Sequence, residues 1–189
     1  VASGASVMEP EAIACALALR VPRVRAASAA FDGPTRLHFH ARGAISNLCV
    51  VEQSNLPAPA DEEVLLRVRA IGLNFRDVLN ILDLDPTRSV RPLGLECSSV
   101  TNATHRSVLN ICKGDQVFGT ALGCLATTVR VDARFQTLKP KSLTFEEAAS
   151  LPILWPTISL ALGKDGMRLA ARQSLLIHAA TGGIGLVTL

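Results

Sequence analysis

The segment Ser174–Gly185 reads SLLIHAATGGIG, an apolar run followed by a glycine-rich turn. Leu175, Leu176 and Ile177 have the length and character of a buried strand, and a helix is expected to begin after the glycines. Read from Ala180, the spacing is A-x-G-x-x-G, the dinucleotide fingerprint with alanine in place of its first glycine. Such a turn lets the backbone approach a pyrophosphate, and the helix that follows offers it free N–H groups.

This motif alone leaves two interpretations open, because adjacent glycines after an apolar run also occur in turns that bind nothing. The residue that reads the ribose of a dinucleotide is expected about twenty residues further on, beyond Leu189. One strand and the start of one helix do not complete a doubly wound sheet. The sequence therefore indicates a fragment of a longer gene product.

Two helices are predicted before this strand. The first begins at Ser142–Thr144 and continues through Glu146 and Glu147, with Thr144 as its N-cap and the glutamates near the positive end of the helix dipole. Pro152 ends this helix, and a second one is expected over Thr157–Leu162. This order is typical of the start of an α/β domain.

Residues 44–141 consist of short apolar segments separated by turn residues. Glu63–Ile71 alternates apolar residues with outward-facing ones such as Arg67 and Arg69, as a half-buried strand does. Closely spaced short strands of this kind favour a small, partly closed β-barrel. Further strands are expected at Leu48–Val51, Gln116–Gly119, Ala126–Val131 and Gln136–Leu138.

Residues 1–43 carry less information. A short helix is expected over Glu11–Leu19, and Phe31–Pro34 reads as a turn. The predicted organisation is therefore an upstream connector at residues 1–43, a β-rich domain at 44–150 and the beginning of an α/β domain at 151–189.

Composition describes a globular chain of 189 residues, with 49% hydrophobic and 19% charged residues. The net charge of +3 is spread out, so nucleic acid is not expected as a partner, and no apolar run is long enough for a membrane helix. The five cysteines are isolated in the sequence, which fits free thiols in a reducing compartment. An alanine-rich start leaves an organelle transit peptide open, but Glu9 and Glu11 argue against one, and a cytoplasmic protein is expected.

Five motifs occur in a characteristic order, and they begin with VRAIGLNFRDVL at residues 68–79. The others are LGLE at 93–96, GDQVFG at 114–119, TFEEAASLP at 144–152 and LIHAATGGIG at 176–185. Together they resemble the enoyl reductase domain of polyketide synthases and animal-type fatty acid synthases. That domain is part of the zinc-free, quinone-oxidoreductase-like branch of the medium-chain dehydrogenase/reductase superfamily.

The resemblance implies a GroES-like substrate domain followed by a Rossmann domain, with NADPH in the cleft between them. The implied reaction is hydride transfer to the β-carbon of an enoyl thioester on acyl carrier protein, followed by protonation at the α-carbon. It also implies other synthase domains as partners and a homodimer in the full protein. The isolated chain is expected to have negligible activity.

The resemblance also implies roles for particular residues. Asn74 and Phe75 would line the nicotinamide end of the cleft, and Thr157 would contact the cofactor. Structural roles are the alternative: Asn74 as a turn cap, Phe75 as a core residue and Thr157 as a helix cap. The pyrophosphate would be bound by the turn residues Gly182, Gly183, Ile184 and Gly185.

The catalytic proton donor is not assigned. Asp85 occupies the position of a tyrosine that is a candidate donor in many of these reductases, and this chain contains no tyrosine. The lysine and aspartate proposed as donors in the synthases would lie beyond Leu189. His178 is interpreted as a buried core histidine, and Asp77 as a residue that caps or pairs locally. Glu96 and Asp115 are interpreted as structural carboxylates.

Two other functions stay open. One is a free-standing, zinc-independent quinone oxidoreductase of the zeta-crystallin type, which would act on small electrophiles. The other is a non-catalytic scaffold inside a megasynthase; the missing tyrosine favours it, and the intact glycine turn opposes it.

The alcohol dehydrogenase branch of the superfamily uses a catalytic zinc, and its ligand positions correspond here to Asn74, Leu95 and Ile153. None of these side chains binds zinc as that site requires. We therefore expect elemental analysis of the purified chain to find no stoichiometric zinc. One zinc ion per chain would contradict this prediction.

Overall fold

The computed structural model describes residues 13–15, 18–20, 32–84 and 90–189, and the chain forms two compact units, Val1–Asp32 and Gly33–Leu189. In the first unit, β1 (Ile13–Cys15) and β2 (Ala18–Arg20) pair as antiparallel strands. The helix expected over Glu11–Leu19 is therefore wrong for the described part of that segment. The remaining elements all belong to the second unit.

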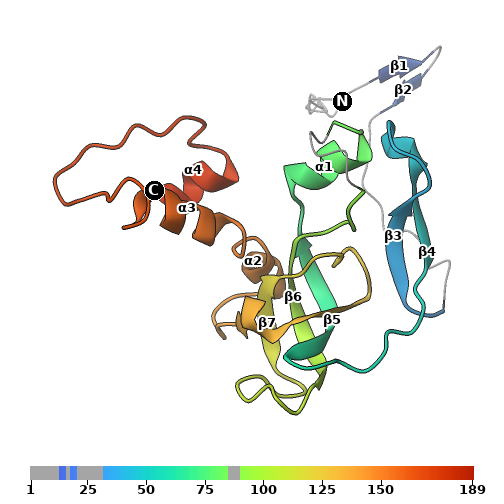
Figure 1. The fold of residues 1–189 in the computed structure, drawn as a ribbon. Helices are drawn as coiled ribbons and strands as arrows, with labels where there is room; N and C mark the ends of the chain where they lie inside the picture. Colours follow the sequence, from blue (N-terminus) through green and yellow to red (C-terminus); the bar gives the residue numbers. More distant parts are fainter. Residues whose placement is uncertain (1–12, 16–17, 21–31, 85–89) are drawn as a thin grey trace, which may run out of the picture. The chain divides into compact units, whose positions relative to one another are not determined.

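An antiparallel sheet of five strands forms the body of the second unit (Figure 1). Alternation decides which side chains are buried: Val64 and Leu66 of the predicted strand are fully buried, whereas Arg67 and Arg69 are exposed. The order of the strands is β8-β5-β6-β7-β9. Their bounds are Glu63–Gly72 for β5, Glu96–Thr104 for β6, Gln116–Thr120 for β7, Thr128–Asp132 for β8 and Gln136–Leu138 for β9.

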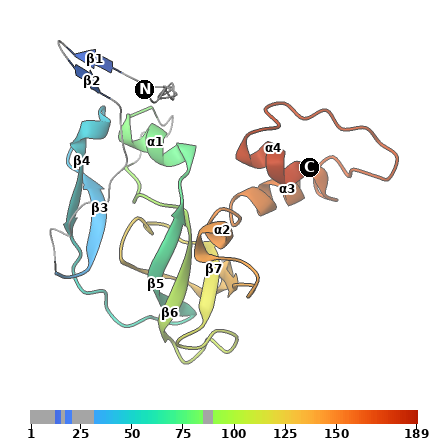
Figure 2. The same ribbon diagram turned by 180° about the vertical axis from the view of Figure 1, so that it is seen from behind.

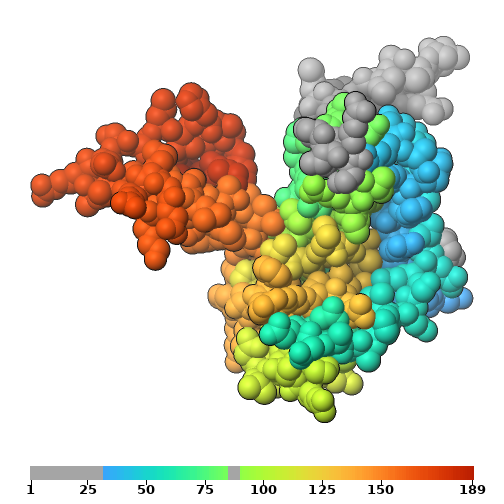
Figure 3. All heavy atoms as spheres, viewed as in Figure 1, coloured from blue at the N-terminus to red at the C-terminus, as the bar shows by residue number. Residues whose placement is uncertain are grey.

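A hairpin of β3 (Thr35–Phe39) and β4 (Leu48–Glu52) lies against this sheet, with the short 3₁₀ helix Ile45–Asn47 between its strands. The N–H of Leu37 donates to the carbonyl of Leu125 at 2.8 Å, and that of Thr127 to the carbonyl of Thr35 at 2.7 Å. Figures 2 and 3 show the blue hairpin beside the rest of the unit. Residues 35–39, assigned from the sequence to the connector, therefore pair with the strands that follow them.

Four helices are described in the second unit: α1 (Phe75–Ile81), α2 (Phe145–Ala149), α3 (Leu154–Leu162) and α4 (Gly183–Thr188). A 3₁₀ turn at Ala133–Phe135 leads into β9. The buried residues Ala148 and Ala149 pack α2 against β5 and β6. Helix α3 begins at Leu154, three residues before the start expected at Thr157.

The apolar run Leu175–Ile177 precedes α4, as predicted, but it is not a strand in this structure. A strand requires a neighbour for its backbone N–H and C=O groups, and no described segment pairs with these residues. Leu176 is 81% exposed. The glycine turn and its helix form locally, whereas the strand before them does not.

Thr144 is the N-cap of α2, as predicted, and the structure adds a capping box with Glu147. The Thr144 hydroxyl accepts from the N–H of Glu147 at 3.1 Å, and the Glu147 carboxylate accepts from the N–H of Thr144 at 2.8 Å. We expect Thr144→Ala to lower the free energy of unfolding by about 1 kcal/mol, because an N–H at the helix start loses its acceptor. Urea unfolding followed by circular dichroism measures this. Thr144→Ser keeps the hydroxyl and is the control; equal losses in both variants would contradict the prediction.

Candidate functional site

A buried carboxylate, Glu96, joins three segments of the chain. Its Oε1 atom accepts from the side-chain amide of Asn74 at 2.9 Å, and its Oε2 atom accepts from the backbone N–H of Ile153 at 2.8 Å. Glu96 is only 4% exposed, so its charge depends on these donors in place of water. The beginning of β6, the loop before α1 and the start of α3 are thereby fixed to one another.

Gly72 leaves the space in which this carboxylate lies. A Cβ atom at position 72 would be 2.6 Å from Cγ and Oε1 of Glu96, and 2.6 Å from the carbonyl oxygen of Ala149. Any side chain at this position would therefore displace the carboxylate or α2. The glycine that ends β5 is required by the contact between the sheet and the helices.

Asn74 has a fixed orientation. Its amide nitrogen donates to Glu96 and, at 3.4 Å, to the carbonyl of Gly72. These contacts direct both N–H groups of the amide inward, so its oxygen is the atom that accepts no hydrogen bond in the described part of the chain. Asn74 is the N-cap residue of α1, but its side chain does not cap the helix.

Phe75 is 73% exposed, so it is not the core residue that the structural alternative required. Leu73, on the other side of Asn74, is 82% exposed. The loop before α1 thus presents two large apolar side chains on either side of an oriented amide. Apolar surface of this kind is suited to contact with a flat ring or an acyl group.

Thr157 lies inside α3, one turn after Ile153. Its hydroxyl donates to the carbonyl of Ile153 at 2.7 Å, so it does not cap the helix. Ile153 therefore binds Glu96 through its N–H and Thr157 through its carbonyl. One chain of hydrogen bonds runs from Asn74 through Glu96 and Ile153 to Thr157.

The glycine turn lies against the first residue of α3. The Leu154 side chain would be 3.3 Å from a Cβ atom at Gly183, and α3 and α4 are in contact. Gly182 and Gly183 are exposed and Ile184 is 43% exposed, whereas Gly185 is buried. The turn is therefore on the surface, with its backbone accessible to a ligand. The roles of these four residues remain predictions.

Three other residues differ from their predicted settings or cannot be placed. His178, predicted to be buried in the core, is exposed because the strand predicted around it is not formed. Asp77, predicted to pair locally, instead accepts from the N–H of Gly94 at 3.0 Å, across 17 residues of sequence. Asp85 lies outside the described residues. Asp115 closes a local turn by accepting from the N–H of Cys112 at 2.8 Å.

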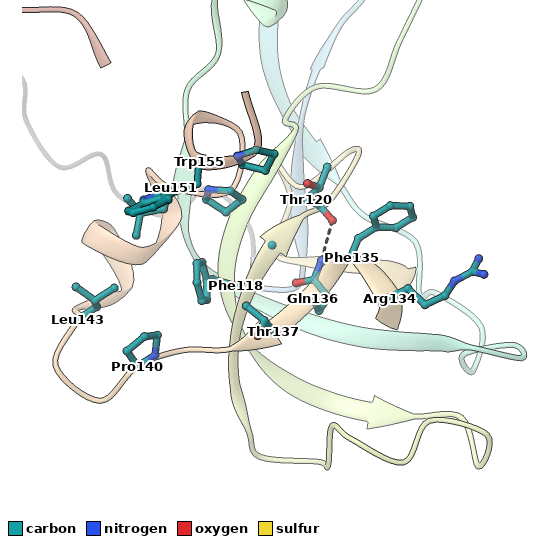
Figure 4. Close-up of a pocket in the computed structure, with 13 residues that line it drawn as sticks. Phe118, Thr120, Arg134, Phe135, Gln136, Thr137, Pro140, Leu143, Leu151 and Trp155 are labelled. Carbon is teal, nitrogen blue, oxygen red and sulfur yellow. Dashed lines mark hydrogen bonds between the residues drawn. The ribbon is translucent and has the colours of Figure 1, made fainter. Parts of the chain in front are cut away.

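A cavity of about 570 Å³ lies next to this network, between β7, β9 and the start of α3 (Figure 4). Sequence reasoning did not single out its residues, although Trp155 is the only tryptophan of the chain. Most of its walls are apolar. The lining residues are Phe118, Gly119, Thr120, Arg134, Phe135, Gln136, Thr137, Pro140, Leu143, Leu151, Pro152, Trp155 and Pro156.

Among the described residues that line this cavity, the one charged side chain is Arg134, and it is already paired. It binds Asp132 at 2.6 Å and approaches Glu62 at 3.5 Å. The hydrogen bond and charge of Asp132 raise the pKa of Arg134, and the hydrogen bonds from Arg134 hold the pKa of Asp132 below its usual value. Arg134 therefore stays cationic at any ordinary pH, with its charge directed to these carboxylates.

Two buried thiols, Cys97 and Cys124, lie in the core of the sheet. Their mutual hydrogen bond and their burial raise the pKa of Cys124, and its thiol donates to the carbonyl of Glu96 at 3.3 Å. A buried thiol with a raised pKa is a poor nucleophile.

Among the described residues, no group of three metal-binding side chains is close enough to hold an ion. In the same part of the chain, no helix has the length and apolar character to cross a membrane.

No family model matches the chain. Among curated proteins it is similar to polyketide synthases. One is the highly reducing polyketide synthase ZEA2 of Gibberella zeae, which is 39% identical over 155 residues, covering 82% of this chain and 6% of the synthase. The chain therefore spans a small part of the relatives that it matches.

Solved structures of similar fold include the CurK enoyl reductase, with a TM-score of 0.73 and 32% identity over 83% of this chain and 50% of that one. The chain belongs to the medium-chain dehydrogenase/reductase superfamily. Another member, the Escherichia coli quinone oxidoreductase complexed with NADPH, has a TM-score of 0.72 and 30% identity, over 82% of this chain and 48% of that one. The chain spans about half of these superfamily members, and the predicted GroES-like and Rossmann fold class is confirmed.

The Glu96 network gives a prediction about stability. In Glu96→Gln, an amide N–H₂ would face one of the two donors, so we expect the free energy of unfolding to fall by about 2 kcal/mol. Urea unfolding followed by Trp155 emission measures the change. Glu52→Gln neutralises an exposed carboxylate of β4 and should change stability by less than about 0.5 kcal/mol.

An NMR measurement tests the network directly. The Asn74 side-chain amide and the backbone N–H of Ile153 both donate to Glu96, and Glu96→Gln leaves one oxygen for these two donors, so the protons of at least one donor should exchange with water faster in this variant than in the unmodified chain. Equal exchange rates, together with equal stability, would contradict the assigned hydrogen bonds.

Proposed function

We propose that this chain contributes the substrate domain and the first part of the cofactor domain to an NADPH-dependent enoyl reductase of a polyketide synthase. The observation that carries the proposal is the hydrogen-bonded chain from Asn74 through Glu96 and Ile153 to Thr157, which also adjoins the glycine turn. Residues expected to contact one cofactor are thereby connected across 83 residues of sequence. Similarity to polyketide synthases and to the CurK enoyl reductase supports the same conclusion.

The residues fit a nicotinamide cofactor. Asn74 offers an oriented oxygen that accepts no hydrogen bond in the described chain, which is suited to the N–H₂ of a carboxamide. Phe75 offers an exposed aromatic face. The exposed backbone of Gly182 and Gly183 suits a pyrophosphate.

NADPH would supply the hydride that reaches the β-carbon of an enoyl thioester. The role of this chain would be to position the two reactants, since hydride transfer requires donor and acceptor carbons in contact. Glu96 would act indirectly, by holding Asn74 and the start of α3 in place. The chain has no tyrosine, so a phenol of this chain would not protonate the α-carbon.

The proposed substrate is carried by acyl carrier protein, and the proposed setting is a cytoplasmic, homodimeric synthase with other domains in the same polypeptide. Quinone reduction is the second candidate, because the similar structures include quinone oxidoreductases from Pseudomonas syringae and Escherichia coli. The two candidates share the cofactor and differ in the electrophile.

A reductase assay of the full-length protein that carries this chain tests the proposal, with NADPH oxidation followed by the fall in its absorbance. We expect turnover with crotonyl-pantetheine to exceed that with a benzoquinone of equal concentration. Thr157→Ala should raise the Kd for NADPH several-fold, because a cofactor contact is lost. The opposite substrate preference would favour the quinone reductase.

A matched control separates cofactor binding from general damage. Ser159→Ala removes an exposed hydroxyl from the same helix and should leave the Kd for NADPH unchanged. Nicotinamide fluorescence that does not change when NADPH is added would contradict the proposal and favour a non-catalytic scaffold.

A further inference from the structure

The cavity between β7, β9 and α3 is large enough for an organic ligand. Its volume of about 570 Å³ is within the usual range for sites that bind small molecules. Figure 4 shows Phe118, Leu143, Leu151 and Trp155 on its walls. These apolar side chains would be covered by an alkyl chain, and Trp155 is 58% exposed without one.

One buried polar atom in this cavity has no partner in the part of the chain that the structure describes. Gln136 is only 6% exposed, and its amide nitrogen donates to the carbonyl of Thr120 at 2.7 Å, as the dashed line in Figure 4 shows. The amide oxygen of Gln136 is buried and accepts no hydrogen bond from the described residues. A buried acceptor left unpaired costs about 1–3 kcal/mol, so a ligand that donates a hydrogen bond to it gains affinity.

The position of Gln136 is fixed by its neighbour on β7. Gly119 pairs with Gln136 in the sheet, and a Cβ atom at position 119 would lie 2.9 Å from the amide carbon and nitrogen of Gln136. The same Cβ would overlap the carbonyl oxygen of Phe135. The absence of a side chain at Gly119 thus allows the Gln136 amide to lie across β7, where it lines the cavity.

The cavity favours a neutral ligand. Of the described residues that line it, Arg134 alone is charged, it is paired with Asp132 and Glu62, and none is a carboxylate. An alkyl chain that carries an uncharged hydrogen-bond donor therefore suits this cavity. A secondary amide between alkyl segments, as in a pantetheine arm, has this chemistry.

We infer that this cavity binds the amide-bearing arm and alkyl chain of an acyl thioester, with the Gln136 amide oxygen accepting from the amide N–H of the ligand. The inference rests on the proposed function, because it specifies how that substrate is held. The cavity is next to the site: Leu151 and Pro152 line it, and the next residue, Ile153, binds Glu96.

Trp155 provides a direct measurement, since it is the single tryptophan, the chain has no tyrosine, and its side chain lines the cavity. Emission from Trp155 would be recorded while the chain is titrated with octanoyl-N-acetylcysteamine, a thioester with one secondary amide. S-ethyl octanethioate has the same acyl chain and no amide. Saturated thioesters avoid addition to the exposed thiols of Cys49 and Cys112.

We expect both probes to change the emission, and the amide probe to bind about fivefold more tightly, the ratio given by one hydrogen bond of about 1 kcal/mol. Phe118→Ala should weaken both probes. Gln136→Leu should remove the preference for the amide while S-ethyl octanethioate still binds. Leu109→Ala, at an exposed residue outside the cavity, should change neither affinity.

Emission unchanged by either probe up to its solubility limit would overturn the inference, as would equal affinities of the two probes for the unmodified chain. If Gln136→Leu does not fold, the affinities of the two probes for the unmodified chain still test the inference. The titration contains no NADPH, so a failure here is distinguishable from a failure of the proposed reductase activity.

Discussion

The buried carboxylate of Glu96 is the constraint on which the candidate site depends. Removal from water is costly for a carboxylate unless N–H donors replace the lost hydration. The donors here are Asn74 and Ile153, which are 22 and 57 residues away in sequence. Satisfying this one charge therefore sets the relative positions of the loop before α1 and the start of α3. The geometry of the site follows from that requirement.

The structural role of Asn74 is compatible with the cofactor contact proposed for it. Its amide nitrogen holds Glu96, and this contact is what directs its oxygen away from the protein's own donors. Phe75 is exposed for a related reason, since the first turn of α1 buries Asp77 through its bond to Gly94 and leaves Phe75 outside. In the N-F-R-D motif, Asn74 and Asp77 are thus held by hydrogen bonds to the sheet and its loops, and Phe75 between them is accessible.

Periodicity predicted much of the fold but not all of it. The alternation at Glu63–Ile71 was sufficient to predict strand β5, and Thr144 was sufficient to predict the start of α2, because each is a local pattern. Strand β6 was missed because its buried residues include Ser98, Ser99 and Thr101, which are not apolar. Strand β3 pairs with the neighbouring β4, but the hydrogen bonds to residues 125 and 127 that join this hairpin to the sheet are long-range, so the sequence did not indicate them. The cavity around Gln136 was not predicted either, because its walls come from segments that are distant in sequence.

Two of the sequence motifs depend on each other physically. Gly72, in the first motif, has no Cβ atom where the carbonyl oxygen of Ala149 and the Glu96 side chain approach. Ala148 and Ala149, in the A-A-S-L-P run, are small enough for α2 to pack closely on β5 and β6. This close packing brings the N–H of Ile153 to Glu96 and puts Leu151 at the wall of the cavity. A larger residue in either motif would therefore disturb the carboxylate contact and the cavity together, although neither motif supplies the carboxylate.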